Sequence, residues 1–400
     1  MMGYALIKQR PMVVAPRARL SSPVRAAVLP AHQKSVVAPL WQQLEREFRA
    51  GLVNSWDWVE TWLNHYGDLV PHWFVVGMSA DGPAGLALIT RGLCHKRGPI
   101  ALRTLHIGTA GEPHTDTVRV EHNRLLAEPH HRAAFAAAIL REATQIDRRC
   151  DLIMLDAFVP EDADLFLAAD PSFVAFPEPC HYADLAALRA QGLTVLDGLR
   201  RHTAAKIRRT MRRLEDQYGP CRVEWATSLP QAEAIFAELR DLHQARWERQ
   251  GQPGVFASQR FTGFHEELIR RLHPQGRATL ARVVAGDHTV GCDYGLVEHG
   301  RILGYQWGLA SFEDSRLSPG LVVGALVMQE ALERGFTEYD WLAGDVLYKR
   351  ELSTSSRTLI TARAIRGPRM HLLDRLTRAK RYLGSRGARL PRLVSGRSLS

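Results

Sequence analysis

Residues suited to holding a phosphate group lie between Arg301 and Leu352. Ser318 is a preferred cap for the start of a helix, and Pro319 has the backbone angle that the first helical position requires. Gly320 leaves room for a ligand to approach the backbone. The unpaired N–H groups and the positive dipole end of such a helix attract anions. The sequence therefore predicts a cradle for a diphosphate at Leu317–Leu321.

Two strands and a helix must position this cradle. Arg301–Ala310 has the β-branched and aromatic content of a buried strand. The helix Leu321–Arg334 is apolar nearly all round, so we expect it to be packed in a core. Gly335 ends that helix, and Tyr339–Leu342 is predicted to be a second strand, parallel to the first.

The same stretch carries a resemblance to a known family. Tyr305-Gln306, Ser318-Pro319-Gly320 and the run YDWLAGDVLYKREL from Tyr339 to Leu352 are similar to the signature of one branch of the Gcn5-related N-acetyltransferase (GNAT) superfamily. This branch, the CelD-like acetyltransferases, is named for an association with cellulose biosynthesis and also resembles the Fem-type peptidyl transferases. The resemblance covers residues 193–359 well, residues 39–184 more loosely, and neither end of the chain. Its upstream part lies in Leu242–Trp247, Gly254–Phe256 and Phe264-His265.

The resemblance implies a mixed α/β fold with two GNAT-like halves, each a mostly antiparallel sheet flanked by helices. Four hundred residues is too long for one ordinary core, which agrees with two domains. Pro177-Glu178-Pro179 is expected to break the chain near the end of the first half. We expect a poorly ordered leader at 1–36, an N-terminal half at 37–188, a C-terminal acetyltransferase domain at 189–366 and a basic tail at 367–400.

For the co-substrate, the resemblance implies acetyl-CoA or another acyl-CoA. In the superfamily the strand before the cradle diverges from the strand after it, and the pantetheine arm lies in the gap. Here the gap would fall between Tyr305–Leu309 and Asp340–Ala343, where backbone N–H groups can bind the thioester carbonyl. The residues expected to contact the coenzyme are Trp307, Gly308, Leu309, Ser318, Pro319, Gly320 and Leu321.

The departing thiolate needs a proton donor. In the superfamily a tyrosine after the second strand often serves, and Tyr348 stands where that tyrosine would fall. A phenol with an ordinary pKa of ~10 suits the protonation of a thiolate. Lys349 is expected either to stabilise the thiolate or to contact the coenzyme. The structural alternative for the pair is a packed tyrosine and a surface lysine.

A base must also take the proton of the attacking amine. Candidates are Asp345 in a loop at a strand end, Asp340 within a strand, and His243. Their structural alternatives are a helix cap, a buried paired carboxylate and a satisfied core histidine. No Ser-His-Asp or Cys-His arrangement is visible in the sequence, which disfavours a covalent acyl-enzyme. The candidates for the acceptor side are His243 and Arg246, which share a helix face, together with Tyr305 and Gln306.

Cysteine and histidine are not spaced as metal ligands. The five cysteines are widely separated without a CxxC pair, and the seventeen histidines are scattered. We therefore expect reduced thiols in a cytoplasm, and neither a metal site nor disulfides. No apolar run approaches the ~20 residues of a membrane-spanning helix, and no secretory signal is visible at the N-terminus.

The positive charge of the chain is concentrated at its C-terminal end. Residues 361–400 hold eleven Lys and Arg against one acidic residue, so they account for the whole net charge of +10. Such a tail either contacts an acidic surface, such as the inner face of a membrane, or is a solvated extension. A basic helix is predicted at Leu196–Tyr218. Its charged side either contacts a polyanion or is simply exposed to solvent.

These features favour a cytoplasmic N-acyltransferase that transfers an acyl group from acyl-CoA to an amine by direct attack. The acceptor would be a small molecule or a precursor of a polysaccharide or envelope polymer. Two other hypotheses stay open. One is a Fem-type peptidyl transferase that uses aminoacyl-tRNA, motivated by the basic helix and tail; nucleic acid is otherwise not an expected partner. The other is a non-catalytic GNAT-fold protein that docks on a membrane or an assembly apparatus.

Overall fold

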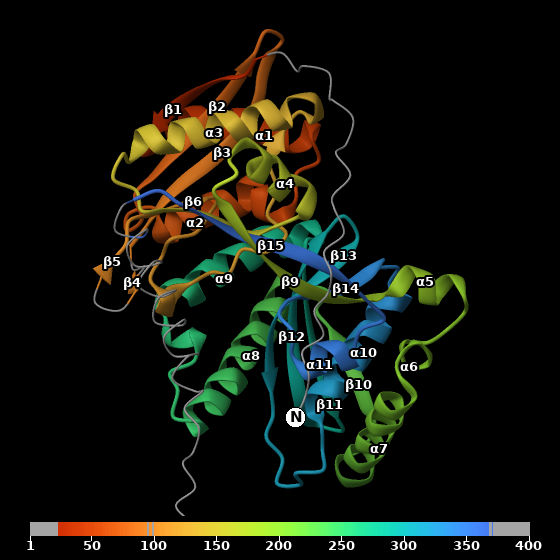
Figure 1. Ribbon diagram of the computed structural model, residues 1–400. Helices are drawn as coiled ribbons and strands as arrows, with labels where there is room; N and C mark the ends of the chain where they lie inside the picture. Colours follow the sequence, from red (N-terminus) through yellow and green to blue (C-terminus); the bar gives the residue numbers. More distant parts are fainter. Residues whose placement is uncertain (1–22, 94–95, 98–99, 368–369, 371–400) are drawn as a thin grey trace, which may run out of the picture.

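The computed structural model describes residues 23–367 and residue 370, with gaps at 94–95 and 98–99. Most of its strands form one continuous sheet with helices on both faces (Figure 1). Two short strands, β4 (Lys96–Arg97) and β5 (Ile100–Ala101), form a separate ribbon, and β7 (Leu126–Ala127) pairs at the side of β3. The order along the sheet is β1 (Arg25–Pro30), β2 (His72–Ser79), β3 (Gly82–Gly92), β6 (Thr104–Ile107), β8 (Leu152–Phe158), β15 (Ser355–Ile365), β9 (Phe173–Asp184), β14 (Glu338–Ala343), β13 (Arg301–Leu309), β12 (His288–Glu298), β11 (Ala278–Ala285) and β10 (Cys221–Trp225).

Helices separate these strands along the chain. No helix in the described part is long and apolar enough to cross a membrane. Their bounds are α1 (Lys34–Glu47), α2 (Trp56–Tyr66), α3 (Arg132–Ile146), α4 (Pro160–Ala169), α5 (Leu185–Ala190), α6 (Val195–Gly198), α7 (Arg201–Tyr218), α8 (Leu229–Arg249), α9 (Gln259–Leu272), α10 (Pro319–Glu333) and α11 (Leu347–Glu351).

The two halves of the sheet repeat the same order of elements. In the N-terminal half, β2, β3 and β6 are antiparallel, and α3 then leads to β8, which is parallel to β6. In the C-terminal half, β11, β12 and β13 are antiparallel, and α10 leads to β14, which is parallel to β13. The prediction of a mixed α/β fold with two similar halves is therefore confirmed.

Helices from both halves share one core. α3 packs on one face of the N-terminal sheet and α1 on the other, while α8 and α10 cover opposite faces of the C-terminal sheet. α2 packs against α9, where the rings of Trp58 and Phe264 lie 5.2 Å apart. An ion pair of 2.7 Å between Arg271 and Glu60 links the same two helices. The halves are thus joined by a continuous apolar core as well as by the sheet.

Strands β9 and β15 are exchanged between the halves. β9 follows the N-terminal half along the chain but pairs with β14, whereas β15 follows the C-terminal half but pairs with β8. The two exchanged strands pair with each other from Ser355↔Tyr182 to Ala364↔Phe173. In Figure 1 they lie side by side at the middle of the molecule, β15 in blue and β9 in yellow-green.

The prolines of β9 do not break the chain, contrary to the prediction for Pro177-Glu178-Pro179. The strand runs continuously from Phe173 to Asp184. Both prolines pair with β15 on one side, but pairing with β14 begins only at Cys180. Because proline lacks an N–H group, it is tolerated where one side of a strand has no neighbour to receive that group.

Two further boundaries differ from the expected ones. The ordered N-terminal half begins before residue 37, because β1 pairs with β2 from Arg25↔Met78 onwards and α1 starts at Lys34. The predicted basic helix is interrupted at Leu199, and its charged part is α7. The first 22 residues of the predicted leader, and residues 371–400 of the predicted basic tail, lie outside the described part of the chain.

Candidate active site

A gap opens between β13 and β14 because the two strands pair only at their first residues. Pairing runs from Arg301↔Glu338 to Leu303↔Asp340 and then stops. Directly beyond, the register between β12 and β13 shifts and leaves Tyr305 without a partner on β12. Such a bulge bends a strand, which turns the rest of β13 away from β14. A cavity of about 560 Å³ lies in the gap, and we call it the donor cleft.

Aromatic rings form the walls of the donor cleft near β14. Trp307 and Trp341 meet edge to face at 4.9 Å, and Tyr348 lies 5.5 Å from Trp307. The indole N–H of Trp307 donates to the buried carboxylate of Asp293, which also accepts from Tyr339. Trp307 is thereby fixed in orientation, and this part of the cleft offers aromatic, apolar walls suited to a slender chain such as pantetheine.

The start of α10 forms the other end of the cleft. Ser318 stands at the N-cap position, but its side chain makes no capping hydrogen bond. Its hydroxyl and the N–H group of Gly320 are therefore available to a ligand, whereas the N–H groups of Leu321 and Val322 already bond to the carbonyl oxygen of Ser318. A second cavity of about 360 Å³ continues from here and shares Arg246, Leu309 and Gly320 with the donor cleft. This end has the features of the predicted diphosphate cradle.

Three cations surround this cradle. Lys206 of α7 lines the donor cleft, Arg249 of α8 lines the second cavity, and Arg246 lines both. None of the three forms an ion pair within the described residues. Arg246 was expected on the acceptor side, and the structure places it beside the helix start instead. Arg249 and Lys206 were missed, although Arg249 follows Arg246 at a spacing that puts both on one helix face.

Most of the other residues expected to contact the coenzyme line these cavities, and one of them packs against α8 instead. Leu309, Gly320 and Leu321 line the donor cleft, and Pro319 lines the cavity that continues from it. Gly308 is buried against α8, where an added Cβ atom would lie 2.3 Å from the carbonyl oxygen of Leu239. Glycine is thus needed at position 308 for the approach of α8 to β13.

His243 is held in the neutral form at the wall of the cleft. Its Nε2 accepts a hydrogen bond of 2.9 Å from the indole of Trp247 and lies 3.4 Å from the amide nitrogen of Gln306. Burial lowers the pKa of His243 to about 4. Because the lone pair of Nε2 is already engaged, His243 is placed to orient Trp247 and Gln306. Tyr305 and Gln306 both line the cleft.

The three candidates that follow β14 have different surroundings, although Tyr348, Lys349 and Asp345 are close in the sequence. Tyr348 lines the donor cleft, and burial raises its pKa, so the phenol is protonated at neutral pH. Lys349 donates to the carbonyl oxygens of Leu342 (3.2 Å) and Ala343 (2.6 Å), which anchors the end of the strand. Asp345 is exposed, pairs with Arg350, and does not line the cleft.

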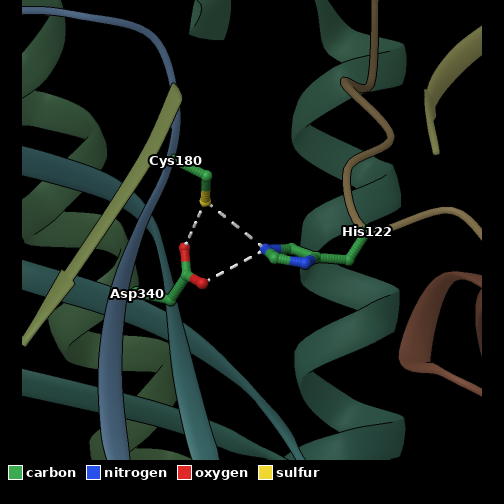
Figure 2. Close-up of side chains that lie close together, drawn as sticks. All are labelled: His122, Cys180 and Asp340. Carbon is green, nitrogen blue, oxygen red and sulfur yellow. Dashed lines mark hydrogen bonds and ion pairs between the residues drawn. The ribbon is translucent and has the colours of Figure 1, made fainter. Parts of the chain in front are cut away.

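Asp340 lies behind the cleft in a buried group with His122 and Cys180 (Figure 2). Cys180 Sγ donates to Asp340 Oδ1 at 3.0 Å, and His122 Nε2 lies 3.2 Å from Asp340 Oδ2. Burial raises the pKa of Asp340, but the hydrogen bond and charge of His122 outweigh it and hold that pKa at about 2. The carboxylate is therefore ionised and paired, as in the structural alternative considered for it.

This buried group also has the side-chain types of a metal site. Among the described residues, it is the group of three whose ligand atoms all lie within 4.8 Å of one another. A zinc site normally has four ligands. The guanidinium of Arg357 lies 3.8 Å from Asp340, so a positive charge already faces the carboxylate. We interpret the group as a polar link between the halves, and the absence of a metal stays a prediction.

Glu121 is a buried residue near the cleft that the sequence did not reveal. One carboxylate oxygen accepts from the N–H group of Ala343, and the other lies 2.9 Å from Nε of Arg119. Glu121 belongs to an irregular segment of the N-terminal half without a periodic pattern, so no local signal pointed to it.

The same segment closes the corresponding gap of the N-terminal half. Asn123 exchanges backbone hydrogen bonds of 3.0 Å with Ala157 and Val159, beyond the point where β6 and β8 separate. Of the two gaps between parallel strands in the described sheet, the one between β13 and β14 is thus the one left open for a pantetheine arm.

Comparisons with known proteins agree with this architecture. Residues 201–350 match the family model of the acetyltransferase (GNAT) domain. The crystal structure of FemX has a TM-score of 0.54 at 13% sequence identity, over 84% of this chain and 98% of FemX. The C-terminal domain of a putative lysylphosphatidylglycerol synthetase from Agrobacterium fabrum has a TM-score of 0.50 at 11% identity, over 82% of this chain and 93% of that domain.

A tandem GNAT protein from the clavulanic acid biosynthesis pathway has a TM-score of 0.44 at 13% identity, over 86% of this chain and 99% of its own. At these identities, the likenesses to solved structures concern the fold alone. A search of curated proteins found no match to the chain.

Proposed function

We propose that the protein transfers an acyl group from acyl-CoA to an amine, because residues 201–350 match the family model of the acetyltransferase (GNAT) domain. The open donor cleft carries this proposal. It combines an apolar channel at β13 and β14 with a helix start and three unpaired cations at its outer end. A coenzyme that has a slender thioester arm and a phosphorylated head matches that order of environments.

The chain's own residues suit direct attack by the amine. Alternate backbone N–H groups of a strand point to the same side, so those of β13 beyond Leu303 that do not pair with β12 face the gap and can stabilise the thioester oxygen. Tyr348 lies at the same end of the cleft and keeps its proton at neutral pH, so it can protonate the departing sulfur. Lys349 positions the end of β14 through its two carbonyl contacts.

The first experiment tests the donor. Purified protein is titrated with CoA and acetyl-CoA in a calorimeter, and CoA release is then followed with a panel of primary amines. We expect micromolar binding and release of CoA that depends on the amine. Absence of CoA binding would remove the basis of the proposal. Binding without turnover of any amine would favour a non-catalytic GNAT-fold protein.

A Fem-type transfer from aminoacyl-tRNA is the second candidate. Arg201, Arg208, Arg209 and Arg212 of α7 are exposed, and Lys206 on the same helix reaches the donor cleft. Phosphate contacts of such a helix weaken steeply as salt rises. A tRNA affinity that falls at least tenfold between 50 and 200 mM salt would support this candidate, and an undetectable tRNA interaction would exclude it.

In this proposal, the basic C-terminal tail brings the protein to a membrane surface. The tail at residues 367–400 carries +8 of the net charge of +10, which suits attraction to an anionic membrane surface from a cytoplasm. An acceptor that is a polysaccharide or envelope precursor would be met at such a surface. Removal of residues 371–400 should abolish sedimentation with vesicles of equal parts phosphatidylserine and phosphatidylcholine while turnover persists. Unchanged sedimentation would contradict the membrane role.

A further inference from the structure

A second large cavity lies in the N-terminal half, between β6, β8 and the segment 110–120. Its volume is about 490 Å³, within the range of roughly 300–1,000 Å³ common for small-molecule sites. Its polar lining consists of carboxylates, hydroxyl groups, histidines and Arg119, whose charge is paired with Glu121 and Glu178. No phenylalanine, tyrosine or tryptophan is among its described lining residues. We call it the polar cavity. Its chemistry differs from that of the donor cleft, so a different ligand must be sought for it.

Two buried groups in the polar cavity have no hydrogen-bond partner within the described structure. Glu112 is 7% exposed; its Oε1 accepts from the backbone N–H of Val118 at 2.8 Å, whereas its Oε2 is unpartnered. The hydroxyl of Thr104 is buried and unpartnered as well. Leaving such a group unsatisfied costs about 1–3 kcal/mol, more when it is charged. A bound ligand that donates hydrogen bonds would satisfy both.

A carboxylate and an imidazole complete the polar wall. His106 Nδ1 lies 2.8 Å from Asp156 Oδ2, and both side chains line the cavity. Burial lowers the pKa of His106, but the charge of Asp156 outweighs it, so the overall shift is upward. The cavity thus presents fixed acceptors at Glu112 and Asp156 beside the threonine hydroxyls. This pattern suits an ammonium group carried on a small skeleton with several hydroxyl groups.

The phenol of Tyr305 lines the donor cleft and lies near enough to Glu112 of the polar cavity to be affected by its charge. Burial raises the pKa of Tyr305, and the negative charges of Glu121 and Glu112 add to this shift. Burial likewise raises the pKa of Glu112, to about 7, with His106 opposing and Asp156 adding to the shift. The titratable groups that act on Glu112 are these two side chains and the phenols of Tyr66 and Tyr305. His114 and Arg119 also line the cavity.

We propose that the polar cavity binds the amine acceptor, an amino sugar or a derivative of one, and that Glu112 is the base that takes its proton. This inference rests on the proposed acyl transfer. The donor cleft would deliver the thioester and the polar cavity would deliver the nitrogen, with the phenol of Tyr305 near both. Glu112 is assigned because one of its oxygens is free inside the cavity while the other holds the cavity wall at Val118.

The bond changes balance without a further reactant. The ammonium gives one proton to Glu112, which passes it to solvent, and the neutral nitrogen bonds to the carbonyl carbon of the thioester. The carbon–sulfur bond then breaks with its electron pair on sulfur. The sulfur takes a proton from Tyr348, and the second proton released by the nitrogen restores the phenol through solvent. The products are an amide and free CoA.

The experiment compares Glu112→Gln with a matched control, Glu161→Gln. The glutamine at 112 keeps an oxygen that can accept from Val118, so the wall should persist. Glu161 is exposed at the start of α4, forms no ion pair within the described residues and does not line the polar cavity. With acetyl-CoA and glucosamine as probes, we expect Glu112→Gln to lower kcat/KM for glucosamine at least 100-fold and leave the Kd of CoA within twofold. The control should match the wild type.

A pH profile separates catalysis from packing. Wild-type kcat/KM for glucosamine should rise through about pH 7, and the rise should be absent in Glu112→Gln. A kcat/KM within threefold of the wild type, or a retained rise, would overturn the inference while leaving the donor function intact.

If no turnover is seen, the binding of glucosamine tests whether the polar cavity is the acceptor site. Glucosamine should bind the wild type at least tenfold more tightly than Glu112→Gln, with and without CoA, and N-acetylglucosamine should bind weakly to both. Failure of the wild type to bind glucosamine would overturn the inference. Failure to bind CoA would instead count against the proposed function.

Discussion

Replacing Gly320 tests whether the start of α10 holds phosphate. Gly320 lines both the donor cleft and the cavity that continues from it, and its built Cβ atom would lie 3.1 Å from a methyl group of Leu309. A side chain at this position therefore points into the space assigned to the diphosphate. Gly320→Glu adds a negative charge there, and Gly320→Gln adds nearly the same volume without the charge.

The expected magnitude follows from Coulomb's law. A carboxylate about 5 Å from one phosphate charge, at an effective dielectric constant near 20, costs on the order of 3 kcal/mol. Each 1.4 kcal/mol is tenfold in affinity, so Gly320→Glu should weaken CoA binding more than 100-fold. Gly320→Gln should cost about 1 kcal/mol, or about fivefold, because the methyl group of Leu309 must move slightly.

Calorimetric titrations with CoA at 50 and 500 mM NaCl measure both variants. The difference between Glu and Gln should shrink at high salt, because screening acts on the charge and not on the volume. Equal losses in the two variants would show that crowding, not charge, governs the site. An unchanged Kd in Gly320→Glu would refute the assignment of the helix start to the diphosphate.

Three further predictions follow from the site. Tyr348→Phe should lower kcat about 10–100-fold with the Kd of CoA unchanged, since the ring beside Trp307 is kept and the proton donor is lost; steady-state kinetics that show wild-type kcat would contradict this. Replacing both Arg246 and Arg249 by Gln should raise the KM for acetyl-CoA about 30-fold, since each solvent-screened contact is worth about 1 kcal/mol. The double replacement should also flatten the dependence of this KM on salt. A KM that rises while its salt dependence is retained would argue against phosphate contacts. Because the folded-state pKa of Asp340 is depressed to about 2, its stabilisation is present above pH ~4 and is lost as the pH falls towards 2. Urea unfolding of the wild type should thus lose on the order of 2 kcal/mol over that window, a loss that Asp340→Asn should not show.

Local signals in the sequence predicted the donor side of the site. The proline at position 319, the glycine at 320 and the apolar helix after them act on neighbouring residues, so their effect is legible from short windows. The strands on either side of that helix follow from residue composition in the same way. These elements place Tyr348 and Trp307 at one cleft without knowledge of the rest of the chain.

The surroundings of the polar cavity and of the buried Asp340 depend on long-range contacts. Glu112, Glu121 and His122 belong to an irregular segment, and their surroundings come from strands far along the chain. Asp340 looked like a candidate base because nothing in the sequence shows that His122 and Cys180 meet it in the core. Helix spacing put Arg246 on one face of α8, but it did not show that the start of α10 lies beside that face.

The exchange of β9 and β15 limits how the enzyme can admit its substrates. A hinge between the halves would have to tear the ladder that joins these two strands along their length, together with the shared core beneath it. Substrates must therefore enter through movements of side chains and loops, while the two halves keep their relative position. The distance between the donor cleft and the polar cavity is then fixed by the fold. For the same reason, a chain cut near residue 188 should yield two pieces that are insoluble apart but reassemble when mixed, as complementing fragments.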